Sequence, residues 1–250
     1  MRQIHEFPKA YSKNAQIPIE DFSESAKRAA REGRASSTLR LAKVIVIGDA
    51  GVGKTSLVMR YTQDVFDLDY KATIGVDFEV EKFDILGIPF TLQMWDTAGS
   101  ERFQAIAASY YRGAAAVVIC FDYSKIQTLQ TVRKWLDNAI SENPTQKFCL
   151  FLVGTKADLV SASVAREIEV EATKIANSMN AEYWSVSSKQ NQNVAEMFAR
   201  IGSVCFDKVL SKEDGISTPK KTTMNIGPKK ILIDEDFNRR TKESNCPCQT

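Results

Sequence analysis

The sequence predicts an α/β domain whose sheet is mostly parallel and is covered by helices on both faces. Residues 43–48, 115–121, 148–153 and 183–186 are short apolar runs, and a helical pattern follows each of them. The helical stretches span about residues 54–61, 126–140, 163–179 and 193–210. Strands that are apolar on both faces and alternate with helices are typical of parallel sheets buried between two helix layers.

Residues 76–86 and 89–95 are the exception to this alternation. The two runs are separated only by the tight Gly87-Ile88 connection, which is the spacing of a β-hairpin. The hairpin adds one antiparallel edge strand to the sheet. We therefore expect six strands in total, mostly parallel.

The 250 residues divide into three segments by composition. Residues 1–40 have no sustained apolar period, and their one short capped helix, from about residue 23 to 33, carries mainly alanine and charge. We expect this segment to be a flexible N-terminal extension. Residues 41–210 form the folded domain, and residues 211–250 form a polar tail.

Charge, cysteine usage and hydropathy exclude several classes of protein. Residues 41–210 carry 17 basic and 20 acidic side chains, so a concentrated basic face for nucleic acid is not expected. Because positions 1–7 contain charged residues, a secretory signal is not expected. The longest apolar run, residues 114–121, is far shorter than the about 20 residues of a membrane-spanning helix. The five scattered cysteines are expected to be reduced in a cytosolic compartment.

The segment Gly48-Asp49-Ala50-Gly51-Val52-Gly53-Lys54-Thr55 matches the pattern G-x-x-x-x-G-K-[ST] between a strand and a helix. Its glycines let backbone N–H groups converge on phosphates, and the helix N-terminus adds its positive dipole end. Lys54 is expected to reach the β- and γ-phosphates, and the Thr55 hydroxyl to bind Mg²⁺. We therefore expect a phosphate-binding loop here, with the next residue, Ser56, also in contact with the nucleotide.

Three further motifs, each at the end of a predicted strand, point to GTP rather than ATP. In Asp96-Thr97-Ala98-Gly99, the Asp96 carboxylate is expected to hold Mg²⁺ through water, and the Gly99 amide is expected to contact the γ-phosphate. The alternative is that Asp96 only caps a turn, which is the commoner role of an aspartate at the end of a strand. Thr155-Lys156-Ala157-Asp158 ends in a carboxylate that accepts two N–H groups from guanine, a donor pair that adenine lacks. Ser187-Ser188-Lys189 is placed to close over the base. A P-loop kinase is disfavoured because the chain has no acceptor domain.

The chain resembles a small GTPase of the Ras superfamily, of the Rab family, over about residues 40–210 and in a cysteine-bearing tail. The Rab-type segments are Ile74-Gly75-Val76-Asp77-Phe78, Leu92-Gln93-Met94-Trp95, Arg102-Phe103 and Tyr110-Tyr111-Arg112-Gly113-Ala114. Two more segments, Tyr70-Lys71-Ala72-Thr73 and Leu86-Gly87-Ile88-Pro89-Phe90, resemble the Rab branch associated with Golgi, macropinosome and ciliary trafficking.

The resemblance implies a P-loop NTPase G domain that binds GTP or GDP with Mg²⁺ and hydrolyses GTP. Tyr70 and Thr73 join the nucleotide site, and Thr73 closes on Mg²⁺ beside Thr55 and Asp96. Loss of the γ-phosphate would release switch I, about residues 64–75, and switch II, about residues 97–108. The aromatic triad through which Rabs contact effectors corresponds to Phe78, Trp95 and Tyr110. Packing on the hairpin is the alternative role for these rings.

One departure from the family pattern affects catalysis. Ser100 stands where most Rabs have a glutamine that orients the attacking water, and serine is about two carbon atoms too short for that role. With Lys54, Thr73, Gly99 and Ser100 as the catalytic set, we expect slow intrinsic hydrolysis. The alternative is a recruitment module that holds GTP persistently, without meaningful turnover. Thr155 replaces the usual asparagine, but its hydroxyl can still reach the phosphate loop.

The C-terminal tail carries Cys246 and Cys248, which resemble the paired cysteines that receive geranylgeranyl groups in Rabs. An unmodified thiol pair is the alternative. The apolar patch at residues 231–233 matches the place where escort and recycling proteins dock. We expect attachment to the cytosolic face of an intracellular membrane, Golgi or endosomal, with a soluble cytosolic pool. The other expected partners are effectors, an exchange factor and a GTPase-activating protein.

Overall fold

The computed structural model describes residues 1–12, 15–33, 39–69, 72–99, 109–145, 147–213 and 215. Its sheet has seven strands in the order β1-β3-β4-β2-β5-β6-β7. The strands are β1 (Arg2–Ile4), β2 (Leu41–Gly48), β3 (Val76–Ile85), β4 (Ile88–Thr97), β5 (Ala116–Asp122), β6 (Cys149–Thr155) and β7 (Glu182–Ser185). Among the strands that the structure describes, only the β3–β4 pair is antiparallel, so the predicted mixed sheet is confirmed, with seven described strands rather than six.

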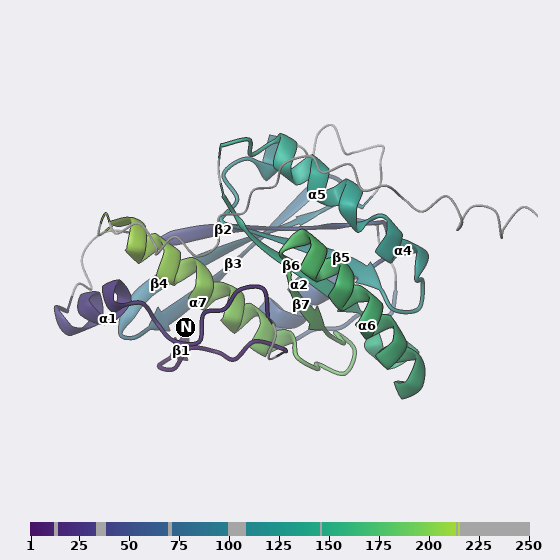
Figure 1. Cartoon of the computed structure of the whole chain (residues 1–250), viewed down its shortest axis with the longest axis horizontal. Coiled ribbons are helices and arrows are strands. Elements are labelled where there is room, and N and C mark those ends of the chain that lie inside the picture. Colours follow the sequence, from purple (N-terminus) through teal and green to yellow (C-terminus); the bar gives the residue numbers. More distant parts are fainter. Residues whose placement is uncertain are drawn as a thin grey trace, which may run out of the picture. The chain divides into compact units, whose positions relative to one another are not determined.

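Helices lie on both faces of this sheet (Figure 1). They are α1 (Glu24–Arg31), α2 (Lys54–Gln63), α4 (Gln127–Gln130), α5 (Val132–Ser141), α6 (Ala162–Met179) and α7 (Val194–Glu213), with 3-10 turns η2 (Ser109–Tyr111) and η3 (Ala157–Leu159). Among the described helices, none combines the length and apolar content needed to cross a membrane.

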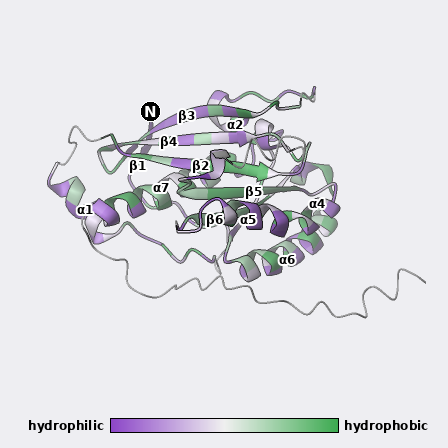
Figure 2. Ribbon diagram, turned by 90° about the horizontal axis from the view of Figure 1, so that it is seen from above, coloured by the Kyte–Doolittle hydropathy of each residue, from purple (hydrophilic) through white to green (hydrophobic). Residues whose placement is uncertain are grey.

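The central strand β2 shows why its sequence is apolar throughout. Val44 and Val46 point into the core shared with α2 and α7, whereas Ile45 and Ile47 point into the core shared with α5 and α6. Neighbouring β5 is likewise hydrophobic almost to its end in Figure 2. Because both faces of a strand are buried, the period-2 polar pattern disappears. The carboxyl ends of these strands meet at one edge, where the phosphate loop begins.

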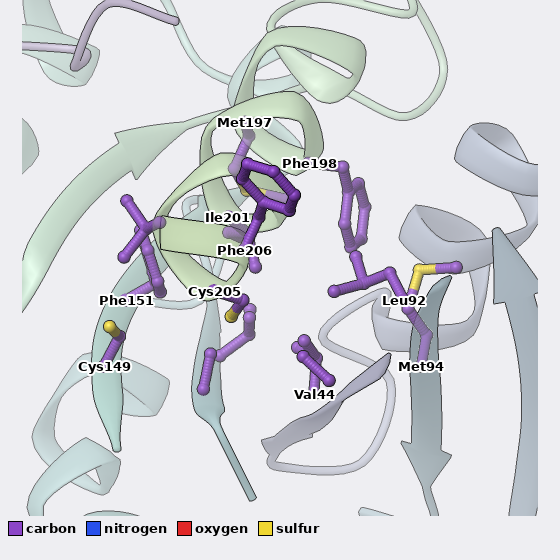
Figure 3. Packing of buried hydrophobic residues seen from close by; sticks show 14 of the residues in the cluster. Val44, Leu92, Met94, Cys149, Phe151, Met197, Phe198, Ile201, Cys205 and Phe206 are labelled. Carbon is purple, nitrogen blue, oxygen red and sulfur yellow. The ribbon is translucent and has the colours of Figure 1, made fainter. Parts of the chain in front are cut away.

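The core on the α7 side joins strand and helix residues directly. In Figure 3, Val44, Leu92 and Met94 from the sheet face Phe198 and Ile201 from α7. These side chains are fully buried. The packing fixes α7 against the sheet, and α7 in turn supports the N-terminal segment.

The N-terminal segment differs from the expected flexible extension. β1 pairs in parallel with β3, from Arg2 opposite Phe83 to Ile4 opposite Ile85, and becomes the seventh strand. Phe22, just before α1, is 4% exposed and packs edge-to-face against Phe206 of α7 at 6.1 Å between ring centroids. The purple N-terminal segment therefore lies across α7 in Figure 1.

A buried arginine explains how a segment without an apolar period still folds. Arg200 of α7 is 1% exposed and forms an ion pair with the fully buried Glu182, with 3.0 Å between Nη2 and Oε2. Its guanidinium also donates hydrogen bonds to the carbonyls of Pro8, Ile17 and Ile19. The N-terminal segment thus folds around the Arg200 guanidinium through its backbone carbonyls. Every residue has a carbonyl, so this interaction cannot be recognised from the residue types. Buried charges need such complete partnering.

Because Phe22 is buried against Phe7 and Phe206, Phe22→Ala is expected to lower the free energy of unfolding by about 3–5 kcal/mol. Urea denaturation followed by circular dichroism measures the change. Val170→Ala on α6 is the matched control, since Val170 is 58% exposed and its truncation should stay within about 0.5 kcal/mol. Equal, small effects of both substitutions would mean that the N-terminal segment is solvated.

Candidate nucleotide-binding site

A cavity of about 480 Å³ opens where β2, β4, β6 and β7 end. It brings together residues from all four predicted motifs. Those that line it are Ala50, Gly51, Gly53, Lys54, Thr55, Ser56, Thr73, Gly99, Thr155, Lys156, Asp158, Ser188 and Lys189. Val52, Asp96 and Ser187 lie directly behind this lining through hydrogen bonds to it. Tyr70, Ser100, Cys246 and Cys248 lie outside the described residues.

The phosphate loop joins β2 to α2 through glycines that a side chain would disrupt. Gly48 has a φ of +141°, and a Cβ there would lie 2.4 Å from the Cys120 carbonyl oxygen. Lys54, 5% exposed, donates from Nζ to the carbonyls of Gly48 and Asp49, both at 2.9 Å. Burial lowers the pKa of Lys54, against the opposing charges of Asp96 and Asp49. These two hydrogen bonds hold the Lys54 ammonium against the backbone of the phosphate loop.

The motif after β6 braces the phosphate loop from the other side. The Thr155 hydroxyl lies 2.5 Å from the Val52 carbonyl oxygen and 2.8 Å from the Phe121 carbonyl oxygen, and its one proton is donated at the shorter distance, to Val52. Lys156 donates from Nζ to the Gly51 carbonyl and to Asp122, both at 2.6 Å. The contact between Lys156 and Asp122 was not predicted, because Asp122 belongs to no nucleotide motif. The one sequence signal for it is a charged residue at the end of a buried strand.

Three oxygen-bearing side chains converge beside Lys54. The Thr55 hydroxyl lies 2.8 Å from that of Thr73 and donates to Asp96 at 2.5 Å. Asp96 is 2% exposed, and its Oδ1 has no hydrogen-bond partner among the described residues. Burial raises the pKa of Asp96 to about 6, opposed by the Thr55 hydrogen bond and the Lys54 charge.

This donor set fits Mg²⁺. Two hydroxyls and one carboxylate are hard oxygen ligands, and a bound cation would compensate the buried carboxylate with its orphaned oxygen. The described residues contain no group of three or more His, Cys, Asp or Glu side chains that could hold a metal alone. Mg²⁺ in nucleotide sites needs no such group, because phosphate oxygens and waters complete its shell.

The two segments predicted to be switches meet at the phosphate loop. The Ala98 amide donates to the Gly75 carbonyl at 2.9 Å, which links the end of switch I to the start of switch II. A Cβ on Gly99 would lie 2.5 Å from the Asp49 carbonyl and the Ala50 nitrogen. Gly99 therefore touches the loop backbone, where the γ-phosphate is expected. The rest of switch II, residues 100–108, is outside the described residues.

Asp158 lines the same cavity together with several apolar side chains. Asp158 accepts a hydrogen bond from the Ser187 hydroxyl at 2.6 Å, which orients its carboxylate. Phe66 and Val65 line the cavity as well, together with Leu159. Sequence reasoning did not identify Phe66, since a lone aromatic near the start of switch I matches no chemical motif.

Comparison with known proteins decides the family. Residues 43–206 match the family model described as the Ras family. Ras-related protein Rab-36 from Homo sapiens is 42% identical over 248 residues, covering 98% of this chain and 92% of the relative. Ras-related protein Rab-34 from Rattus norvegicus is 45% identical, covering 98% and 96%. Ras-related protein Rab-13 from Rattus norvegicus is 34% identical but covers only 76% of this chain and 93% of its own length.

The chain is a Rab small GTPase of the Ras family. It therefore binds GTP and GDP with Mg²⁺, hydrolyses GTP and works as a switch in vesicle trafficking. Effectors, exchange factors and GTPase-activating proteins are partners of this family, whose members associate with membranes.

The aromatic triad of this Rab lies together on the β3–β4 hairpin and η2. Phe78 and Trp95 are in edge-to-face contact at 5.1 Å between centroids, and Trp95 and Tyr110 are 5.6 Å apart. Phe78 is 45% exposed and Tyr110 is 37% exposed. Lys43 lies over the Trp95 ring at 4.2 Å. The three rings form a continuous surface with an accessible edge.

Proposed function

We propose that this Rab hydrolyses GTP slowly on its own and presents effectors with a long-lived GTP state. The observation that carries the proposal is the position of Gly99 against the phosphate loop. Ser100 follows Gly99 in the sequence, at the position where most Rabs have the glutamine that orients the attacking water.

Each proposed site residue has a defined task. Lys54 and the loop amides stabilise the charge of the β- and γ-phosphates, and Gly99 contributes an amide to the γ-phosphate. Thr55, Thr73 and Asp96 would hold Mg²⁺, which would neutralise the negative charge that develops on the phosphates. Asp158 accepts the guanine N–H groups. The remaining nucleotide contacts come from Ala50, Gly51, Val52, Gly53, Ser56, Tyr70, Thr155, Lys156, Ser187, Ser188 and Lys189.

Hydrolysis requires a water aligned with the γ-phosphate. The Ser100 hydroxyl cannot reach the position of a glutamine amide, so the water is oriented for only a small fraction of the time. An activating protein can restore the hydrolysis rate, since an arginine supplied in trans raises kcat by roughly 10³–10⁵-fold. A persistently GTP-bound module, without such restoration, is the alternative function.

Ser100→Gln is expected to speed single-turnover hydrolysis of preloaded GTP by about 10–100-fold, the range over which a misplaced reacting group costs rate. Ser163→Gln, at an exposed position in the first turn of α6, is the matched control and should leave the rate unchanged. Equal and ordinary rates for all three proteins would show that another group positions the water.

We also propose that the active state recruits effectors through switch I, switch II and the triad Phe78, Trp95 and Tyr110. The exposed edges of these rings beside both switches support an interface, since aromatic side chains are enriched in interface cores. An exchange factor and an activating protein are proposed to act on the same switches.

Membrane attachment is proposed to come from geranylgeranyl groups on Cys246 and Cys248. Two lipid chains give stable anchoring, whereas one is marginal. Residues 231–233 are the proposed contact for escort and recycling proteins, which would maintain a soluble cytosolic pool. The proposed location is the cytosolic face of a Golgi or endosomal membrane, in line with the Rab branch that the chain resembles.

Replacing both Cys246 and Cys248 by serine is expected to move the full-length protein entirely into the soluble fraction in a flotation assay. Each single substitution should give partial flotation, because one chain binds only marginally. Ser244→Ala is the control. The intact mass of the unaltered protein from cells should include two geranylgeranyl groups, and an unmodified mass on the membrane would contradict the proposal.

A further inference from the structure

Arg60, in the last turn of α2, reaches the loop that is proposed to contact the base. Its Nε donates to the carbonyl of Ser188 at 2.7 Å. The Arg60 side chain is only 15% exposed, so this charge-assisted bond is largely shielded from water. No nucleotide motif in the sequence includes Arg60.

The direction of this bond matters for the base. The peptide unit between Ser188 and Lys189 is planar and trans, so its C=O and N–H groups point in opposite directions. When Arg60 holds the Ser188 carbonyl, the Lys189 N–H is directed away from Arg60. Ser188 and Lys189 both line the cavity, beside Asp158. The tether therefore fixes a backbone donor next to the carboxylate proposed to bind guanine.

The same guanidinium also contacts the segment that follows α2, part of which lines the cavity. Arg60 Nη1 donates to the carbonyl and the carboxylate of Asp64, at 2.9 and 3.0 Å, where the chain turns out of α2 with a φ of +55°. It also lies 5.9 Å from the ring centroid of Phe66, which lines the cavity. One side chain thus joins the loop after β7 to the first residues of switch I.

The N-terminal strand supports this helix turn. Arg2 of β1 donates from Nη2 to the Tyr61 carbonyl at 2.6 Å, and its guanidinium lies 4.3 Å from the Tyr61 ring centroid. Phe198 of α7 stacks on the same ring, at 4.3 Å between centroids with 22° between planes. Arg60 and Arg2 also line one small cavity of about 240 Å³. Tyr61 directly follows Arg60 in α2, so Arg2 holds the residue next to Arg60.

We propose that Arg60 is a positioning residue for the guanine base and that Arg2 holds its helix turn in place, so that the N-terminal strand contributes to nucleotide retention. The inference rests on the proposed binding of the guanine base by Asp158. We call residues 187–189, after β7, the base-side loop. If this loop is ordered before the nucleotide binds, binding no longer has to pay the entropic cost of ordering it. Without the tether, that loop moves and the base is released sooner.

The test measures the affinity of the full-length protein for GDP and for the diphosphate of 2-aminopurine riboside, which lacks the C6 oxygen of guanine. Arg60→Gln is expected to weaken GDP binding about tenfold, the usual scale for losing a hydrogen bond to a charged donor. Binding of the 2-aminopurine nucleotide should change less than twofold, since it has no acceptor for the positioned N–H. Arg60→Lys keeps the charge and should recover part of the GDP affinity.

Arg2→Gln is expected to speed the dissociation of fluorescently labelled GDP by about two- to fourfold, because it removes only the support of the helix turn. Equal weakening of both nucleotides by Arg60→Gln, or no weakening of either, would overturn the positioning role. An unchanged GDP dissociation rate in Arg2→Gln would overturn the contribution of the N-terminal strand. If the proposed site itself were wrong, the unaltered protein would show no preference for GDP over the 2-aminopurine nucleotide.

Discussion

The phosphate loop can turn its amide groups toward a nucleotide only if its carbonyl groups are held elsewhere. The carbonyls of Gly48 and Asp49 are held by Lys54, that of Gly51 by Lys156, and that of Val52 by Thr155. Buried backbone acceptors without partners are costly, so these bonds select one loop conformation before any ligand arrives. The anion site is therefore already organised in the protein itself.

The rest of the architecture supplies these partners. The parallel sheet brings the ends of β2 and β6 to one edge, and Gly48 allows the loop to pass within contact of the Cys120 carbonyl. Helix α2 carries Lys54 at its start and Arg60 at its end, so the same helix contacts the phosphate loop and the base-side loop. The N-terminal strand and α7 then hold the far end of that helix through Tyr61.

The parts of the structure that depend on side-chain identity could be predicted from the sequence. The apolar strands, the Gly87 hairpin and the phosphate loop each require particular residue types, and the structure confirms the sheet that they imply, with α6 and α7 close to the predicted stretches. The N-terminal segment could not be predicted in this way. Arg200 holds it through backbone carbonyls, which every residue has, and its few buried aromatics follow no period. Arg60 was missed for a similar reason, because its partner at the base-side loop is also a carbonyl.

The central claim is that side chains from outside the phosphate loop set its conformation and hence its affinity. Fluorescence titration of GDP against Thr155→Val tests it most directly, because valine keeps the shape but removes the hydroxyl that holds the Val52 carbonyl. Thr62→Val, which removes a hydroxyl that donates to the Val58 carbonyl within α2, is the control. The account predicts about tenfold weaker GDP binding for Thr155→Val alone, the cost of one unsatisfied buried acceptor. Binding within twofold of the unaltered protein would contradict it.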